Sequence, residues 1–81
     1  MANPDQARDA IRNAISSAGG VVGAASAAGV SPSMLYKYLA SERDLGPDTV
    51  TRLARVLPDV PEAIWLAAMS VHIDVRPEAG A

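Results

Sequence analysis

Residues 21–40 read VVGAASAAGVSPSMLYKYLA, and this stretch decides the fold of the chain. Its first half consists mostly of small residues and ends at Gly29, which tolerates a positive φ without steric cost. Ser31 and Pro32 then form a helix start, because Ser is a preferred N-cap and Pro is tolerated at the first helical position. The second half places three large apolar side chains on one side of a helix: Leu35, Tyr38 and Leu39. The stretch therefore predicts two short helices joined by one tight turn.

This order of small residues, glycine, cap and amphipathic helix is typical of a helix-turn-helix motif. Helices that cross steeply need small residues where they touch, and the first helix has three alanines there: Ala24, Ala25 and Ala28. Val30 and Leu35 are expected to fill the angle between the helices, with the Tyr38 ring beneath them. An ordinary helical hairpin has the same glycine and helix cap, so it is the alternative to a helix-turn-helix motif. The joint pattern of glycine and apolar positions favours the DNA-binding motif.

Helix signals also cover most of the remaining chain. An Asn-Pro pair at residues 3–4 begins a first helix, and two glycines at residues 19–20 end it. Pro47 begins a fourth helix after a charged loop, and a fifth begins at Pro61. No segment has the pattern of a convincing strand or of an internal repeat. The sequence therefore predicts an all-α chain of five helices.

The length of 81 residues leaves room for one domain. We expect the helix-turn-helix domain to span residues 1–73, with the motif at residues 21–40. Residues 74–81, DVRPEAGA, show no periodicity and are expected to form a flexible C-terminal tail.

The composition argues against several classes of protein. The absence of cysteine excludes disulfides and cysteine-ligated zinc, and one histidine makes a metal site unexpected. The sequence has no Gly-rich phosphate loop, no carboxylate pair and no nucleophile–base pattern. We therefore expect no enzymatic activity, no cofactor and no small-molecule substrate. With no signal peptide and no apolar run long enough to span a bilayer, we expect a cytoplasmic protein that does not bind membranes.

The net charge of −2 argues weakly against binding to nucleic acid. The acidic residues, however, are concentrated at the C-terminal end. Residues 58–81 carry four acidic side chains and one arginine, whereas residues 21–57 carry four cations and three acidic side chains. Because a local basic stripe sets the attraction for phosphate, the net charge does not exclude DNA.

The fifth helix is apolar on two sides. One stripe can face the core and consists of Ile64, Ala67, Ala68 and Val71. The other lies about 100° away on the same helix and consists of Trp65, Met69 and His72. A helix of this kind is either deeply buried or shared with a partner. We expect the second stripe to form the interface of a homodimer.

The chain resembles the lambda-repressor-like helix-turn-helix domains of phage repressors and Cro-like regulators. The resemblance covers about residues 7–57 and is strongest to the short Cro or YdaS-like group, in which a helix ending in AGG leads directly into the motif, as residues 18–20 do here. Two positions depart from the pattern. Val21 stands where many members carry a glutamine, and the second motif helix has one charge instead of several polar side chains.

The resemblance implies a small transcriptional regulator of the repressor type. It would bind a pseudo-palindromic operator of double-stranded DNA sequence-specifically as a homodimer, with residues 32–40 as the recognition helix in the major groove. Its implied contacts on this helix and the following loop are Ser31, Pro32, Ser33, Tyr36, Lys37, Ser41 and Arg43.

Some of these residues have an alternative role. Tyr36 can contact a thymine methyl group or a phosphate, or it can instead pack on its neighbours. Ser33 can contact a base edge, or it can serve only to favour helix initiation. Arg43 can instead pair with Glu42 or Asp44. Lys37 is the strongest candidate, because it can bond guanine O6 and N7 and has few other uses.

A second function competes with DNA binding. The acidic balance, the weakly polar recognition helix and the two-sided fifth helix also suit a protein-interaction or antitoxin-like module with the same fold. A positive ridge around Lys37 and Arg43 would favour DNA, and an apolar ridge would favour a protein partner.

Overall fold

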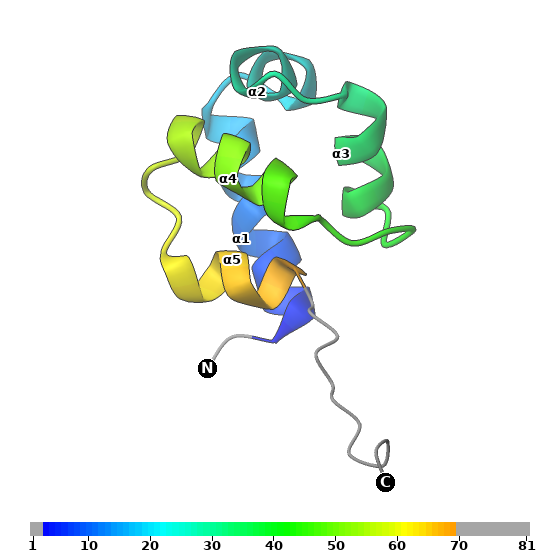
Figure 1. The fold of residues 1–81 in the computed structure, drawn as a ribbon, viewed down its shortest axis with the longest axis vertical. Helices are drawn as coiled ribbons and strands as arrows, with labels where there is room; N and C mark the ends of the chain where they lie inside the picture. The colour runs from blue at the N-terminus through cyan, green and yellow to red at the C-terminus, as the bar shows by residue number, and fades with distance from the viewer. Residues whose placement is uncertain (1–2, 70–81) are drawn as a thin grey trace, which may run out of the picture.

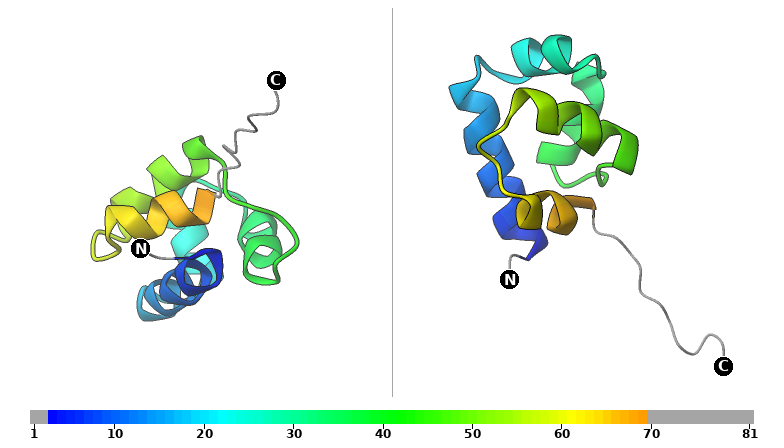
Figure 2. Two further views of the ribbon diagram at one scale, coloured as in Figure 1. Left: turned by 90° about the horizontal axis from the view of Figure 1, so that it is seen from below. Right: turned by 60° about the vertical axis from the view of Figure 1, so that its left-hand side comes forward.

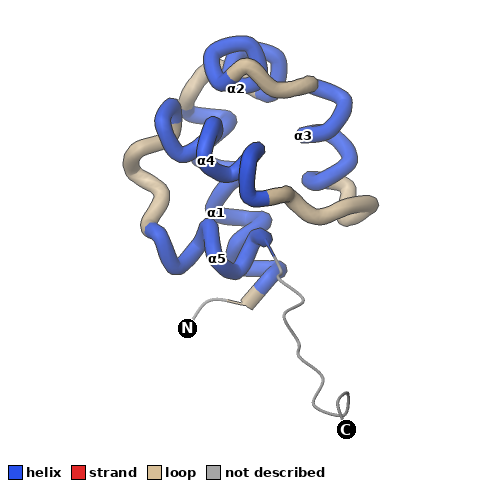
Figure 3. The backbone as a smooth tube through the Cα atoms, viewed as in Figure 1, coloured by secondary structure: helices blue, strands red, loops and turns tan. Residues whose placement is uncertain are grey.

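The computed structural model describes residues 3–69, which form five α-helices and no strand. The helices are α1 (Pro4–Ser17), α2 (Val21–Ala28), α3 (Pro32–Leu39), α4 (Pro47–Val56) and α5 (Glu62–Met69). The predicted all-α fold of five helices is thus confirmed, and Figure 3 shows short loops between the helices. The expected boundary between domain and tail, at residues 73 and 74, and His72 lie outside the described residues.

Local capping explains where the helices begin. At the start of α1 the Asn3 side chain accepts a hydrogen bond from the Gln6 N–H at 2.8 Å, and the Asn3 N–H donates to Gln6 Oε1 at 3.1 Å. This pair of bonds is a reciprocal capping box, and it begins the helix where the sequence predicts. Before α3, the Ser31 Oγ accepts from the Met34 N–H at 3.4 Å, and a proline opens the helix. The segments therefore start as helices for reasons contained in their own sequence.

The helices enclose one core. In Figure 1, α2 lies at one end of the molecule and α5 towards the other, with α4 between them, while α1 packs against α5 and also contacts α2 and α3. The largest fully buried side chains are Ile11, Ile15, Leu35, Tyr38, Leu45 and Leu53. Leu45 comes from the charged loop before α4, and its burial anchors that loop to the core. No helix within residues 3–69 has the length and apolar character that crossing a membrane requires.

The orientation of α5 corrects one prediction. Trp65 is only 5% exposed and packs in the core with Ala68, so its indole is already covered within one copy of the chain. It is therefore not an exposed dimer-interface side chain. The predicted core stripe also faces the core, with Ala68 buried and Ile64 and Ala67 partly buried against it. Met69 is half-buried, and the large exposed apolar residue of α5 is Leu66, which is 53% exposed.

Candidate nucleic-acid interface

α3 stands at one side of the molecule, and its outer face is open. It packs through buried Leu35 and Tyr38, and its neighbouring helices are α1 and α2. The left view in Figure 2 shows α3 and the loop after it at the margin of the molecule. The predicted DNA contacts are all exposed: Ser31, Pro32, Ser33, Tyr36, Lys37, Ser41 and Arg43. The structure thus brings them to one continuous segment of helix and loop.

The turn before α3 has the geometry that the sequence predicts. Gly29 lies in the left-handed region with a φ of +74°, and the N–H of Val30 donates to the Ala25 carbonyl at 3.0 Å. Ala25 is completely buried, so the backbones of α2 and α3 can approach closely. Since non-glycine residues are strained at this φ, Gly29 fixes the angle at which α3 leaves α2.

The cations near α3 differ in how they are engaged. Neither Lys37 nor Arg43 takes part in the ion pairs formed within residues 3–69. Arg52 on α4 does pair with Asp48, at 3.1 Å, as its spacing of four residues predicts. Lys37 therefore presents a positive charge beside the open face of α3, and Arg43 adds a second one in the following loop, between Glu42 and Asp44 in the sequence.

The end of α3 is closed by an unusual residue. Ser41 has a φ of +66°, and among residues 3–69 no other non-glycine residue has a positive φ. The N–H of Ser41 donates to the Tyr38 carbonyl at 3.0 Å, and the N–H of Glu42 donates to the Lys37 carbonyl at 2.8 Å. This pair of bonds is a Schellman motif, in which the left-handed position usually holds glycine. It reverses the chain sharply and places Arg43 directly after the helix.

We predict that Ser41→Gly raises the free energy of unfolding by about 1 kcal/mol, because glycine adopts the left-handed conformation without strain. Ser33→Gly is the matched control. It lies inside α3 with helical backbone and should lower stability by about 0.5–1 kcal/mol. Urea unfolding followed by circular dichroism measures both changes. A loss of stability in Ser41→Gly would contradict the strain at this position.

Two arginines of α1 reach the same end of α3. The Arg8 Nε donates to the Tyr38 carbonyl at 3.1 Å, and the Arg12 Nη2 donates to the Leu39 carbonyl at 2.9 Å. The Arg8 guanidinium also lies 5.4 Å from the centre of the Tyr38 ring. Sequence reasoning missed these contacts because it did not connect the first helix with the recognition helix. The available signal was the placement of the two arginines one turn apart on α1.

Tyr38 itself is a buried polar residue. Its hydroxyl has no hydrogen-bond partner among the described residues. Burial raises the pKa of the Tyr38 phenol above its ordinary value, and the nearby Arg8 cation partly opposes that rise. The phenol is thus neutral at physiological pH. The Tyr38 ring packs in the core on the inner side of α3, as predicted.

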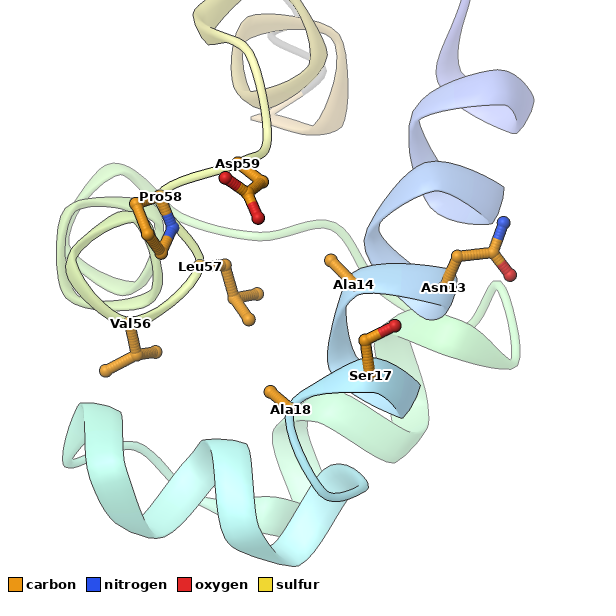
Figure 4. Close-up of a pocket in the computed structure, with 8 residues that line it drawn as sticks. All are labelled: Asn13, Ala14, Ser17, Ala18, Val56, Leu57, Pro58 and Asp59. Atoms are coloured by element: carbon orange, nitrogen blue, oxygen red, sulfur yellow. The ribbon is translucent and has the colours of Figure 1, made fainter.

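Other hollows on the surface lie away from this face. Figure 4 shows one between the C-terminal half of α1 and the connection from α4 to α5, where Ala14 and Ala18 point towards the side of Leu57. Its polar side chains are Asn13, Ser17 and Asp59, which form no nucleophile–base pair. A shallow groove between α4 and α5 is mostly apolar and includes Leu66 and Met69. Within residues 3–69, no three acidic, histidine or cysteine side chains gather as a metal site requires.

Comparison with known proteins agrees with this geometry. A family model described as helix-turn-helix matches residues 23–65, which is more than half of the chain. The matched segment contains most of α2, the turn at Gly29, all of α3 and α4, and the first half of α5. The chain matches no curated protein and no solved structure.

Proposed function

The chain belongs to the lambda-repressor and Cro-like helix-turn-helix family, a DNA-binding family of transcription regulators, and on this premise we propose that it binds double-stranded DNA sequence-specifically with α3 in the major groove. The observation that carries the proposal is the outer face of α3, which is exposed and bears Lys37 without an ion pair within the described residues. The major groove of B-DNA is wide enough to admit one α-helix.

Three exposed side chains of α3 each have a chemical partner on a base edge. The Lys37 ammonium can donate to guanine O6 and N7, and the Tyr36 ring can contact a thymine methyl group. The Ser33 hydroxyl donates and accepts, so it suits several base edges. Good contacts of this kind discriminate between bases by about 1–3 kcal/mol each, which is enough for specificity when several act together.

The ends of α3 provide contacts of another kind. Ser31 and Pro32 lie at the helix N-terminus, and Ser41 and Arg43 follow its last turn. We assign Ser31, Ser41 and Arg43 to the sugar-phosphate backbone, which positions a protein on DNA without reading sequence, and Pro32 to the face in the major groove. Arg43 supplies the charge for this role.

One copy of α3 reads only a few bases, so we propose that the protein acts as a homodimeric repressor in the cytoplasm. Two recognition helices about one turn of DNA apart would read a pseudo-palindromic operator. The surface that supports this dimer is the outer side of α5, where Leu66 is exposed beside Met69 and the groove to α4. In this interface Leu66 replaces the predicted Trp65.

Selection of duplexes from a random pool at 100 mM salt tests the proposal. We expect enrichment of a palindromic consensus whose half-sites are about 10 base pairs apart from centre to centre. Affinity for a selected duplex should fall steeply with salt, because phosphate contacts release counterions. No enrichment above the starting pool would contradict DNA readout and would favour the protein-interaction alternative.

A further inference from the structure

The carbonyl end of α3 is held from outside the motif. The last carbonyls of a helix have no partner within the helix and carry partial negative charge. In this protein, the carbonyls of Tyr38 and Leu39 accept hydrogen bonds from Arg8 and Arg12, which lie 30 and 27 residues earlier in the sequence. The recognition helix is therefore attached to α1 by two charged donors as well as by apolar packing.

Each arginine is itself oriented by an acidic residue of α1. Asp5 Oδ1 accepts from Arg8 Nη1 at 3.0 Å, and Asp9 Oδ1 accepts from Arg12 Nη1 at 2.8 Å. Each arginine thus forms a unit of three groups: a carboxylate of α1, its own guanidinium and a carbonyl of α3. The two units lie one helical turn apart on α1. A side chain bound at both ends has a fixed position, so each unit sets a distance between α1 and the last turn of α3.

The two arginines differ in burial. The Arg8 side chain is 15% exposed and lies over the Tyr38 ring, so its loss would also disturb the core. The Arg12 side chain is 46% exposed and makes no ring contact within the described residues. Arg12 is therefore the residue at which a positioning role can be separated from a role in packing.

We propose that Arg12, supported by Arg8, is a positioning residue for DNA recognition. By holding the Leu39 carbonyl, it fixes the last turn of α3 and the Schellman turn at Ser41, and so sets the register of Lys37 and Arg43 on the duplex. The inference rests on the proposed function. It assigns α1 a part in specificity that acts through α3.

A phosphate contact is the alternative role for Arg12, because its two bonds leave other N–H donors of the guanidinium available. Its Nη1 is bound to Asp9 and its Nη2 to the Leu39 carbonyl. A phosphate contact would contribute to all DNA binding and to its salt dependence, with a slope of about −0.9 for each phosphate neutralised. A positioning residue instead changes the ratio of specific to non-specific affinity.

Arg12→Met tests the proposal, since methionine keeps an unbranched chain and removes both bonds. We expect the amide protons of Ser41 and Glu42, which close the turn after α3, to exchange about tenfold faster in the variant because their turn opens more often. We also expect the ratio of affinities for a selected and a random duplex to fall about tenfold. The salt dependence of binding to the random duplex should stay the same.

Two variants serve as controls. Arg55→Met removes an exposed arginine of α4 that has no ion pair within the described residues, and it should leave amide exchange at Ser41 and Glu42 unchanged. Arg12→Lys keeps a cationic donor and should restore part of both effects. Circular dichroism at the working temperature shows whether each variant is folded.

The outcomes are distinct. Unchanged exchange at Ser41 and Glu42 in Arg12→Met would overturn the proposal. So would a uniform loss of affinity for all duplexes with a shallower salt slope, which is the result for a phosphate contact. If the wild-type protein selects no duplex, the proposed function fails, while the exchange measurement still decides whether Arg12 fixes the end of α3.

Discussion

Trp65→Ala is expected to remove most of the stability of this domain. The indole is 5% exposed and packs in the core, and truncation of a buried tryptophan typically costs about 3–5 kcal/mol. Domains gain only about 0.05–0.15 kcal/mol per residue in total, so a chain of this size has little stability to spare. Urea unfolding followed by far-ultraviolet circular dichroism measures the loss, since the variant lacks the fluorescent side chain.

Leu66→Ala is the matched control for Trp65→Ala, because it changes the next residue of the same helix. Leu66 is half-exposed, so its truncation should change the free energy of unfolding by less than about 0.5 kcal/mol. If α5 forms the proposed dimer, sedimentation should show weaker self-association of this variant. A stable Trp65→Ala together with an unfolded Leu66→Ala would show that α5 faces the core with the other side.

Helix starts and the motif turn were predictable because their signals are local. The Asn3 cap, the prolines at helix starts and Gly29 each act within a few residues, through capping bonds or allowed φ values. The residues on the outer face of α3 were also predictable. Once Leu35 and Tyr38 point inward, the helical period places Tyr36 and Lys37 outside.

The orientation of α5 was not predictable from periodicity. With apolar residues on two sides, the pattern does not say how deeply Ile64 and Trp65 are buried, and only packing against α1 and α4 decides. The burial of Leu45 was not predictable for a similar reason, since a single apolar residue in a charged loop forms no periodic pattern. Its burial depends on contacts that form only in the folded chain.

The contacts of α1 with α3 also could not be predicted from local sequence patterns. Arg8 and Arg12 look like members of i, i+3 ion pairs with Asp5 and Asp9, and they do form those pairs. Their second bonds, to carbonyls of α3, depend on how the two helices pack. Likewise, the absence of an ion pair at Arg43 within the described residues depends on the loop conformation.

Lys37→Ala is expected to cause the largest loss in DNA binding. Lys37 lies exposed in the last turn of α3 and has no ion pair within the described residues, so nothing in that part of the chain competes with DNA for its charge. Loss of a specific base contact typically costs about 1–3 kcal/mol, and a dimer loses one contact in each half-site, or roughly 2–6 kcal/mol in total. Fluorescence anisotropy with a selected duplex measures this fall in affinity at fixed salt.

A double-mutant cycle identifies what Lys37 contacts. If Lys37 reads a guanine, replacing that base pair in both half-sites should weaken the wild-type protein strongly and Lys37→Ala hardly at all. Arg52→Ala removes one positive charge from α4 that is paired with Asp48, and any effect on affinity should be equal for selected and random duplexes. Equal losses for Lys37→Ala on both duplexes would instead assign Lys37 to phosphate, because only a base contact can make its effect depend on sequence. Unchanged affinity would remove Lys37 from the interface, since an exposed cation in the major groove cannot be lost without effect.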